Sequence, residues 1–195
     1  MSAETFSKSK ISQSEFSVIK QQGFNRVPLV REVLADLDTP LSTYLKLANA
    51  PYSYLFESVQ GGEKWGRYSI IGLPCKKVIK ISGHEICEYE DERLINQQTV
   101  ADPLQWIDDY QSHFKVFEDE NLPRFTGGLV GYFGYETIAY IEKRLAKTGK
   151  PDPLQTPDIL LMVSEEVVVF DNLSGKLFII VHADTSDENA LEKGE

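Results

Sequence analysis

The chain has 195 residues, a formal net charge of −10 at pH 7 and a sequence pI of about 4.8. Its length is that of one domain and is sufficient to bury a sizeable hydrophobic core. The content of 42% hydrophobic and 26% charged residues is typical of a soluble globular protein. The negative charge disfavours nucleic acid as a partner, because its phosphates would be repelled. No apolar run approaches the roughly 20 residues that span a bilayer, and the N-terminus lacks the apolar segment of a secretory signal. We therefore expect a cytoplasmic protein with no membrane partner.

The two cysteines fit a reducing compartment. Cys75 and Cys87 are too few to build a disulfide framework in a chain of this length. Together with His84 they could be interpreted as metal ligands beside a hairpin, but a fourth ligand and the C-x-x-C spacing are missing, so structural thiols are the better interpretation. No Ser-His-Asp, H-E-x-x-H or nucleophile-elbow pattern occurs. The sequence therefore predicts neither a catalytic group nor a metal ligand in this chain.

The N-terminal quarter of the chain is predicted to form a helix, a strand and a second helix. Residues 1–11 are polar, and we expect them to be disordered. A short amphipathic helix is expected over Ser14–Gly23, with the glycine as its stop. The segment Val27–Leu37 shows helical spacing but contains a proline near its start, and we interpret it as a strand. Thr39-Pro40 is typical of a helix start and predicts a helix that reaches Ala48.

A β-hairpin pattern covers the next twenty or so residues. An apolar run beginning at Tyr54 stops at Glu57-Ser58, Gly61-Gly62 turns the chain, and Arg67-Tyr68-Ser69 starts the return run Ile70-Ile71. A carboxylate, a hydroxyl and a guanidinium beside an apolar floor could hold a small zwitterion, since the carboxylate would bind an ammonium and the other two groups a carboxylate. This pattern is that of an amino-acid-binding site. Each residue also has an ordinary structural interpretation, as a solvated strand end or a cross-strand ion pair.

The rest of the chain is predicted to consist mostly of hairpins, with helices between them. A second hairpin is expected from Val78–Ser82 and Glu85–Glu90, and Asp102-Pro103 starts another helix. A glycine-rich strand, Gly127–Gly134, should be followed by a helix through Lys143. It lacks the lysine of a phosphate-binding loop, so its glycines are expected to allow a close backbone approach or a bend.

The C-terminal third is rich in strand-forming residues. The run Ile159–Phe170 is interrupted only at Ser164-Glu165-Glu166, and a turn then leads into the strand Lys176–His182. The final residues, Asp184–Glu195, begin like an acidic helix. Because the strands lack a regular βαβ alternation, we expect an α+β fold with antiparallel, sandwich-like β-sheets and flanking helices.

Four stretches resemble the amino-terminal region of anthranilate synthase component I, in the order in which that family has them. The resemblance extends over about residues 12–184, and we take 1–11 as a disordered N-terminus and 185–195 as the start of a cut-off helix or linker. The four stretches are R-V-P-L-V-R-E-V-L-A-D-L-D-T-P-L-S-T-Y-L-K-L (Arg26–Leu47), Y-L-F-E-S with R-Y-S-I-I-G (residues 54–58 and 67–72), G-G-L-V-G-Y-F-G-Y-E (Gly127–Glu136) and P-D-I-L-L-M-V-S-E-E-V-V-V-F-D (Pro157–Asp171).

The resemblance implies a regulatory role. The family converts chorismate and ammonia, or glutamine, to anthranilate and pyruvate on the route to tryptophan. It uses Mg2+ and a glutamine amidotransferase subunit as partner. The catalytic groups and the Mg2+ ligands would lie in a half that follows residue 195, so this chain alone should be inactive. The resemblance places the family's L-tryptophan feedback site at the strand end, with Leu55, Glu57, Ser58, Arg67, Tyr68 and Ser69 as the expected contacts. It also places the glycine-rich segment in the core of the sheet.

Three other functions remain open at this point. Component I of aminodeoxychorismate synthase shares the architecture, although the Glu57-Ser58 pair and the match at Arg26–Leu47 favour the anthranilate enzyme. The chain could also be a free-standing amino-acid sensor or a purely structural interaction module. Against a free-standing domain, the acidic segment at the C-terminus ends in mid-element.

Overall fold

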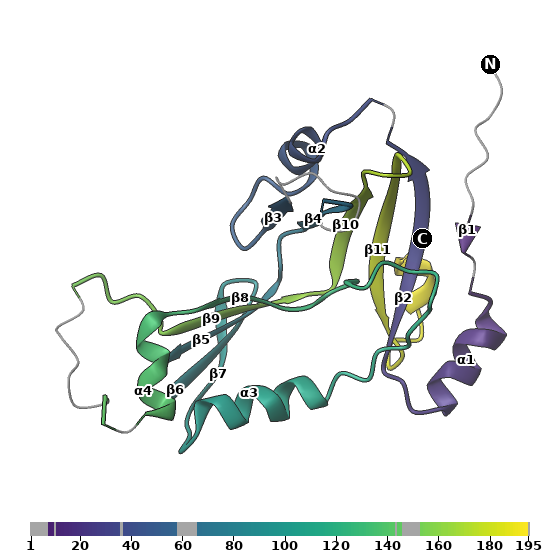
Figure 1. The fold of residues 1–195 in the computed structure, drawn as a ribbon. Coiled ribbons are helices and arrows are strands. Elements are labelled where there is room, and N and C mark those ends of the chain that lie inside the picture. Colours follow the sequence, from purple (N-terminus) through teal and green to yellow (C-terminus); the bar gives the residue numbers. More distant parts are fainter. Residues whose placement is uncertain are drawn as a thin grey trace. The chain divides into compact units, whose positions relative to one another are not determined.

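The computed structural model describes residues 8–9, 11–35, 37–57, 66–142, 144–145 and 153–194 (Figure 1). In chain order the elements are β1 (Lys8–Ser9), α1 (Gln13–Gln21), β2 (Arg26–Leu34), α2 (Pro40–Leu47), β3 (Tyr54–Glu57), β4 (Tyr68–Gly72), β5 (Lys77–Ser82), β6 (Glu85–Glu90), β7 (Arg93–Thr99), α3 (Pro103–Ser112), β8 (Gly128–Phe133), the 3-10 helix Tyr135–Thr137, α4 (Ile138–Ile141), β9 (Ile159–Ser164), β10 (Glu166–Asp171), β11 (Lys176–Asp184) and α5 (Ala190–Lys193). They form two compact units. Unit 1 comprises Met1–Pro74, Phe114–Gly127 and Ser164–Glu195, and unit 2 comprises Cys75–His113 and Gly128–Val163.

Unit 1 is built on a six-stranded sheet with the strand order β1-β2-β11-β10-β4-β3. Every neighbouring pair is antiparallel, and the long β2–β11 ladder runs from Arg26 opposite Asp184 to Leu34 opposite Lys176. Strand β10 lies in the middle, and its residues Val167–Phe170 are each at most 3% exposed. Such continuous burial is typical of a strand that is covered on both faces.

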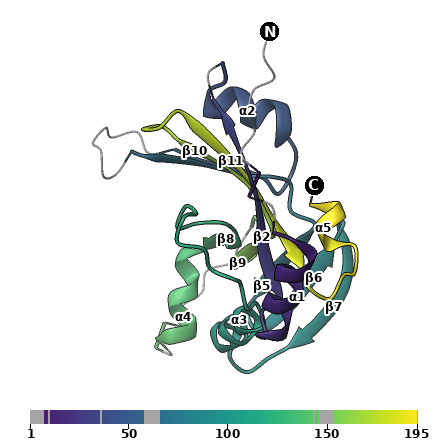
Figure 2. The same ribbon diagram turned by 90° about the vertical axis from the view of Figure 1, so that its right-hand side faces the viewer.

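Helices of unit 1 pack on one face of its sheet. Alternate residues of each strand point to the same face, so their apolar side chains form a continuous surface for the helices. At one end of that face, Val27 and Ala183 pack with Phe16 and Ile19 of α1 and with Ala190 of α5, and both helices lie beside β2 (Figure 2). At the other end, a second cluster joins the sheet to α2, which lies near β3 and β4 in Figure 1. The buried members of this cluster are Ala48, Ile71, Val168, Phe170 and Leu177.

The helix starts follow the capping signals in the sequence. Thr39 caps α2 by accepting from the backbone N–H of Ser42, and Pro40 occupies the first turn, as predicted. Asp102 caps α3 in the same way, with Pro103 following it. In α1 the cap is Ser12, whose hydroxyl and backbone pair with Glu15 in a capping box. These local bonds fix where each helix begins.

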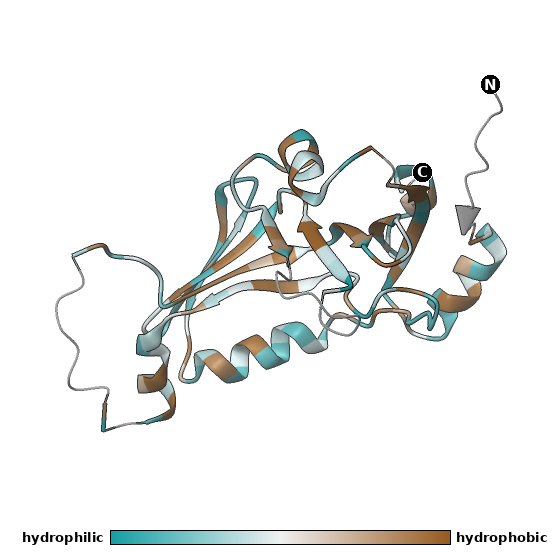
Figure 3. Cartoon of the chain, turned by 45° about the horizontal axis from the view of Figure 1, so that its top comes forward, coloured by the Kyte–Doolittle hydropathy of each residue, from teal (hydrophilic) through white to brown (hydrophobic). Residues whose placement is uncertain are grey.

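Unit 2 is built on a five-stranded sheet with the order β7-β6-β5-β9-β8. Figure 3 shows hydrophobic residues along these strands and an alternation of hydrophobic and hydrophilic residues along α3. Strand β8 lies at the edge of this sheet among the described residues. An added Cβ at Gly131 would lie 1.8 Å from the carbonyl oxygen of Leu160 in β9, so this glycine permits a close backbone approach.

The predicted α+β fold with antiparallel sheets and flanking helices is confirmed. Both hairpins are present, and the long apolar run near the C-terminus divides at Glu165 into β9 of one sheet and β10 of the other. The glycine-rich segment provides the close backbone approach that was expected. Strand β1 lies within the segment 1–11, for which composition predicts disorder, and pairs with β2.

Several sequence predictions were wrong. Strand β7 was not predicted; it follows a turn with positive φ at Asp91 and Glu92. The helix expected through Lys143, which itself lies outside the described residues, is a 3-10 turn followed by the four-residue helix α4. The helix expected to begin in the acidic C-terminal segment is present as α5. Strand β2 ends at Leu34 rather than Leu37, and the glycine-rich β8 lies at a sheet edge rather than in the sheet core. Apart from β7, which was missed, short-range sequence patterns overestimated the length or the burial of these elements.

Candidate amino-acid-binding site

The predicted strand-end site is located on the hairpin formed by β3 and β4. Their register places Tyr54 opposite Gly72 and Glu57 opposite Ser69, so the last residue of β3 faces the second residue of β4. The pairing at Tyr54 is tight, because an added Cβ on Gly72 would lie 1.9 Å from the Tyr54 ring. The Tyr54 hydroxyl forms a buried 2.8 Å hydrogen bond with the Ser164 hydroxyl. These contacts fix the register that brings Glu57 to Ser69.

The predicted contact residues divide between the two faces of the sheet. Leu55, Glu57 and Ser69 share the face on which α2 packs, and Leu55 lies against the second hydrophobic cluster. Tyr68 belongs to the opposite face, because it is adjacent to Ser69 in the same strand. Glu57 is exposed, whereas Ser69 is only 3% exposed. Ser58 lies outside the described residues.

Arg67 lies at the strand end and forms an ion pair with Asp171 of β10. Its Nε donates to Asp171 Oδ1 at 3.0 Å and its Nη2 donates to Oδ2 at 2.6 Å. The Arg67 hydrogen bonds, aided by the backbone N–H of Leu173, lower the pKa of Asp171 to about 2 against the opposing effect of burial. Arg67 also lies over the Tyr68 ring, 4.9 Å from its centre. The guanidinium therefore has the cross-strand partner that the sequence offered as the alternative to a ligand contact.

Asn172 connects this ion pair to Ser69. Its side-chain Nδ2 donates to Ser69 Oγ at 3.1 Å and to the Gly66 carbonyl at 3.3 Å. Its backbone N–H donates to the Arg67 carbonyl at 2.8 Å. Because the amide donates to the Ser69 hydroxyl, that hydroxyl is oriented by the turn that follows β10.

Sequence reasoning missed Asp171 and Asn172. They follow a fully apolar run and precede a glycine turn, which by itself indicates only the end of a strand. Their proximity to Arg67 and Ser69 arises from the β4–β10 pairing, which places Asp171 opposite Tyr68 across about a hundred residues of chain. A local pattern carries no information about such a pairing.

Chemically, the strand end offers an exposed carboxylate, an oriented hydroxyl and an apolar floor. Glu57 can accept hydrogen bonds from an ammonium, and Leu55 with the α2 cluster can contact an apolar side chain. Two of the five N–H donors of Arg67 are bonded to Asp171, so a ligand carboxylate would meet a guanidinium whose charge is already balanced. The features that best suit an amino acid are therefore on the face that carries Leu55, Glu57 and Ser69.

The described part of the chain contains no candidate metal-binding site. No group of three or more His, Cys, Asp or Glu side chains there could hold a metal ion. Cys75 and Cys87 are both half-buried, and no disulfide joins them. Among the described helices, none has the length and apolar character needed to cross a membrane.

Comparison with known proteins gives a clear relationship. The chain is 56% identical over 185 residues to anthranilate synthase component 1 of Pseudomonas aeruginosa, an alignment that covers 95% of this chain. The chain is homologous to the amino-terminal region of anthranilate synthase component 1. Proteins of the same name from Neisseria meningitidis and Aquifex aeolicus are 55% identical over 186 residues and 40% identical over 161 residues, respectively.

The chain spans about 38% of the length of the Pseudomonas aeruginosa and Neisseria meningitidis proteins. It also aligns with the crystal structure of anthranilate synthase component I from Streptococcus pneumoniae TIGR4, with a TM-score of 0.48 and 27% identity, over 83% of this chain and 34% of that one. No family model matches the chain.

Proposed function

We propose that this chain is the amino-terminal regulatory region of an anthranilate synthase component 1. The observation that carries the proposal is the 56% identity over 95% of the chain, in an alignment that takes up only 38% of the relative. A match of this quality along the whole chain supports a common role, and the small share of the relative leaves room for the chemistry elsewhere. The complete protein would be a cytoplasmic lyase of tryptophan biosynthesis.

The proposed ligand of this region is L-tryptophan, bound at the end of the β3–β4 hairpin as a feedback inhibitor. Glu57 is suited to the ammonium group, and Ser69, oriented by Asn172, is suited to a polar group of the ligand. Ser58, next along the chain from Glu57, is proposed as a further hydroxyl contact. The apolar floor at Leu55 would take the indole ring. Arg67 is proposed at the rim, where it holds Asp171 in place. Tyr68, on the opposite face of the sheet, is proposed to act through its contact with the Arg67 guanidinium.

In the complete enzyme, the proposed reaction converts chorismate and ammonia, or glutamine, to anthranilate and pyruvate. We propose that a glutamine amidotransferase subunit supplies the ammonia and that Mg2+ supplies electrophilic assistance in the remaining part of the protein. Inhibition is then a linkage between two sites, because tryptophan must favour a conformation that binds chorismate poorly.

The experiment that tests this proposal compares two proteins. The 195-residue chain alone should form no anthranilate from chorismate and ammonia, as followed by the fluorescence of anthranilate, whereas the complete protein that carries it should form anthranilate with an initial rate that tryptophan lowers. Measurable turnover by the short chain would overturn the location of the chemistry.

A substitution at Ser58 tests the location of the feedback site. Ser58→Phe replaces the proposed hydroxyl contact with a bulky apolar group, so the complete protein should lose most of its inhibition by tryptophan, measured relative to its own uninhibited rate. Unchanged inhibition in this variant would remove Ser58 from the site.

A further inference from the structure

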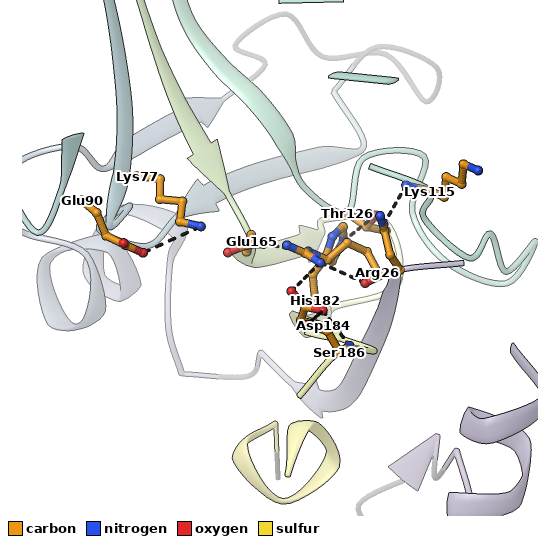
Figure 4. Close-up of polar contacts among 10 residues, drawn as sticks. Arg26, Lys77, Glu90, Lys115, Thr126, Glu165, His182, Asp184 and Ser186 are labelled. Carbon is orange, nitrogen blue, oxygen red and sulfur yellow. Dashed lines mark hydrogen bonds and ion pairs between the residues drawn. The ribbon is translucent and has the colours of Figure 1, made fainter. Parts of the chain in front are cut away.

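A buried arginine lies at the end of β10 that is opposite to the Arg67–Asp171 pair. Arg26, at the start of β2, donates from Nε to Glu165 Oε1 at 2.9 Å and from Nη1 to Asp184 Oδ2 at 2.7 Å (Figure 4). Its guanidinium carbon lies 5.3 Å from the centre of the Phe114 ring. The Arg26 side chain is only 13% exposed, while its two carboxylate partners are 38% and 40% exposed. We call Arg26, Phe114, Glu165 and Asp184 the Arg26 clamp.

Two members of the Arg26 clamp, Phe114 and Glu165, lie at or next to ends of the sequence segments that make up unit 1. Within unit 1, Phe114 and Ser164 are the first residues after two passages of the chain between the units, and Gly127 is the last residue before a third. Glu165 immediately follows Ser164. Gly127 lies so close to Ser164 that an added Cβ would be 2.5 Å from the Ser164 carbonyl oxygen. The clamp and the residues next to it therefore include the unit-1 ends of three segments that lead to unit 2.

Neighbouring bonds tie the same segments to the β2–β11 ladder. The Thr126 hydroxyl and His182 Nε2 are 3.2 Å apart, and the backbone N–H of His182 donates to the Glu165 carbonyl at 2.8 Å. The backbone N–H groups of Asn25 and Arg26 both donate to the Lys115 carbonyl. These hydrogen bonds link the segments at Lys115, Thr126 and Glu165 to the β2–β11 ladder and the residue before it.

Strand β10 joins the clamp to the proposed tryptophan site. Glu165 precedes its first residue and is bound to Arg26, whereas Asp171 is its last residue and is bound to Arg67. Between them the strand is hydrogen-bonded to β4 and β11 and is almost fully buried. Local bending of a strand that is paired and packed in this way would break hydrogen bonds of its ladders, so β10 is suited to transmit a displacement from one end to the other.

We propose that Arg26 and Glu165 couple tryptophan binding to the segments that connect the two units. This inference rests on the proposed function. A ligand beside Ser69 acts on Asn172 and hence on the Asp171 end of β10. A shift of the Glu165 end would displace the Arg26 guanidinium through their hydrogen bond, and with it the connecting segments. Neither residue touches the ligand, so they are positioning residues whose removal should weaken regulation rather than binding.

The test uses Glu165→Gln in the complete protein that carries this chain. The amide keeps a hydrogen-bond acceptor for Arg26 Nε but removes the negative charge, and Arg26 retains Asp184. The coupling is measured as the ratio of the chorismate KM with saturating tryptophan to that without it. We expect this ratio to fall by about two- to thirty-fold, the range by which substitutions along a coupling network change the coupling. The tryptophan Kd measured without chorismate and the melting temperature should stay close to the wild-type values.

Glu166→Gln is the matched control, because it removes the same charge from the next residue, whose side chain is exposed. It should keep the wild-type ratio. Arg26→Lys is a second variant, which keeps the positive charge but loses the forked geometry, and it should also lower the ratio. A folded Glu165→Gln protein with the wild-type ratio would overturn the coupling role. A wild-type protein that does not bind tryptophan would instead overturn the proposed function, so the two failures are distinguishable.

Discussion

Arg67 and Asp171 are 104 positions apart in the sequence and form a two-point ion pair at the end of the six-stranded sheet. The carboxylate is 3% exposed and also accepts from the backbone N–H of Leu173, so its charge is fully hydrogen-bonded. Because Asn172 follows directly and donates to Ser69, this pair determines the position of the Ser69 hydroxyl in the proposed site.

Asp171→Asn is expected to destabilise the isolated chain by about 1–3 kcal/mol at neutral pH, because Arg67 loses a charged partner and a buried group loses acceptor capacity. The pKa of Asp171 is lowered to about 2 in the folded protein, so its stabilising effect is complete above about pH 4 and is lost as the pH falls through about 2. Urea unfolding at pH 7 and at acid pH measures both effects. Equal losses of stability with pH in the two proteins would contradict this assignment.

Gly72→Ala should destabilise the β3–β4 hairpin. The new methyl group would overlap the Tyr54 ring, which is 8% exposed and bonded to Ser164, so the ring must move and the bond must weaken. We expect a cost of about 1–3 kcal/mol in urea unfolding. In a Tyr54→Ala background the same substitution should cost much less, because the overlapping ring is gone. A single variant as stable as the wild type would show that the ring has another position available.

Stability is also expected to decrease below about pH 6.5 because of His182. Burial of the imidazole, together with the nearby Arg26 charge, lowers its pKa in the folded protein, although Glu165 opposes this. The unfolded chain therefore takes up the proton first, and the free energy of unfolding falls as the pH drops below the ordinary histidine pKa. His182→Gln should remove this slope, whereas His113→Gln should retain it. An NMR titration of His182 with a pKa above the ordinary value would contradict the prediction.

Gly131→Ala should destabilise the edge of the unit 2 sheet. Its Cβ would meet the backbone of Leu160, which cannot move aside as a flexible side chain could. We expect a loss of about 1–3 kcal/mol. Hydrogen exchange followed by mass spectrometry should show faster exchange in β8 and β9, while exchange in β2 and β11 remains at the wild-type rate. Unchanged protection of β9 would show that the close approach is not required.

Much of the fold was predictable because local signals decided it. The Thr39-Pro40 and Asp102-Pro103 pairs identified helix starts, and the interruption at Ser164-Glu165-Glu166 identified the division between β9 and β10. Strand β7 was not predictable in the same way, because its residues are mostly polar and exposed and show no period-2 pattern. Its pairing with β6 supplies the backbone hydrogen bonds that its composition does not suggest.

The candidate site was predictable only in part. The strand-end position of Glu57 and the start of the return strand at Arg67 follow from the hairpin pattern, and the observed register confirms that hairpin. Leu55, Glu57 and Ser69 lie on one face of the sheet and Tyr68 on the other. Strand alternation predicts this difference, but only once the register of the two strands is known. The partners Asp171 and Asn172 depend on a long-range pairing, as does the approach of Glu165 to Arg26. Long-range pairings are not encoded in short patterns.

The strand-end feedback site is tested most directly by calorimetric titration of L-tryptophan into the complete protein that carries this chain. We expect saturable binding that weakens strongly in Glu57→Gln, because the ligand ammonium loses its charged partner. Binding should be unchanged in Glu92→Gln, which alters an exposed glutamate in the β6–β7 turn. The absence of tryptophan binding in the wild-type protein, or equal affinity in Glu57→Gln, would contradict the strand-end feedback site.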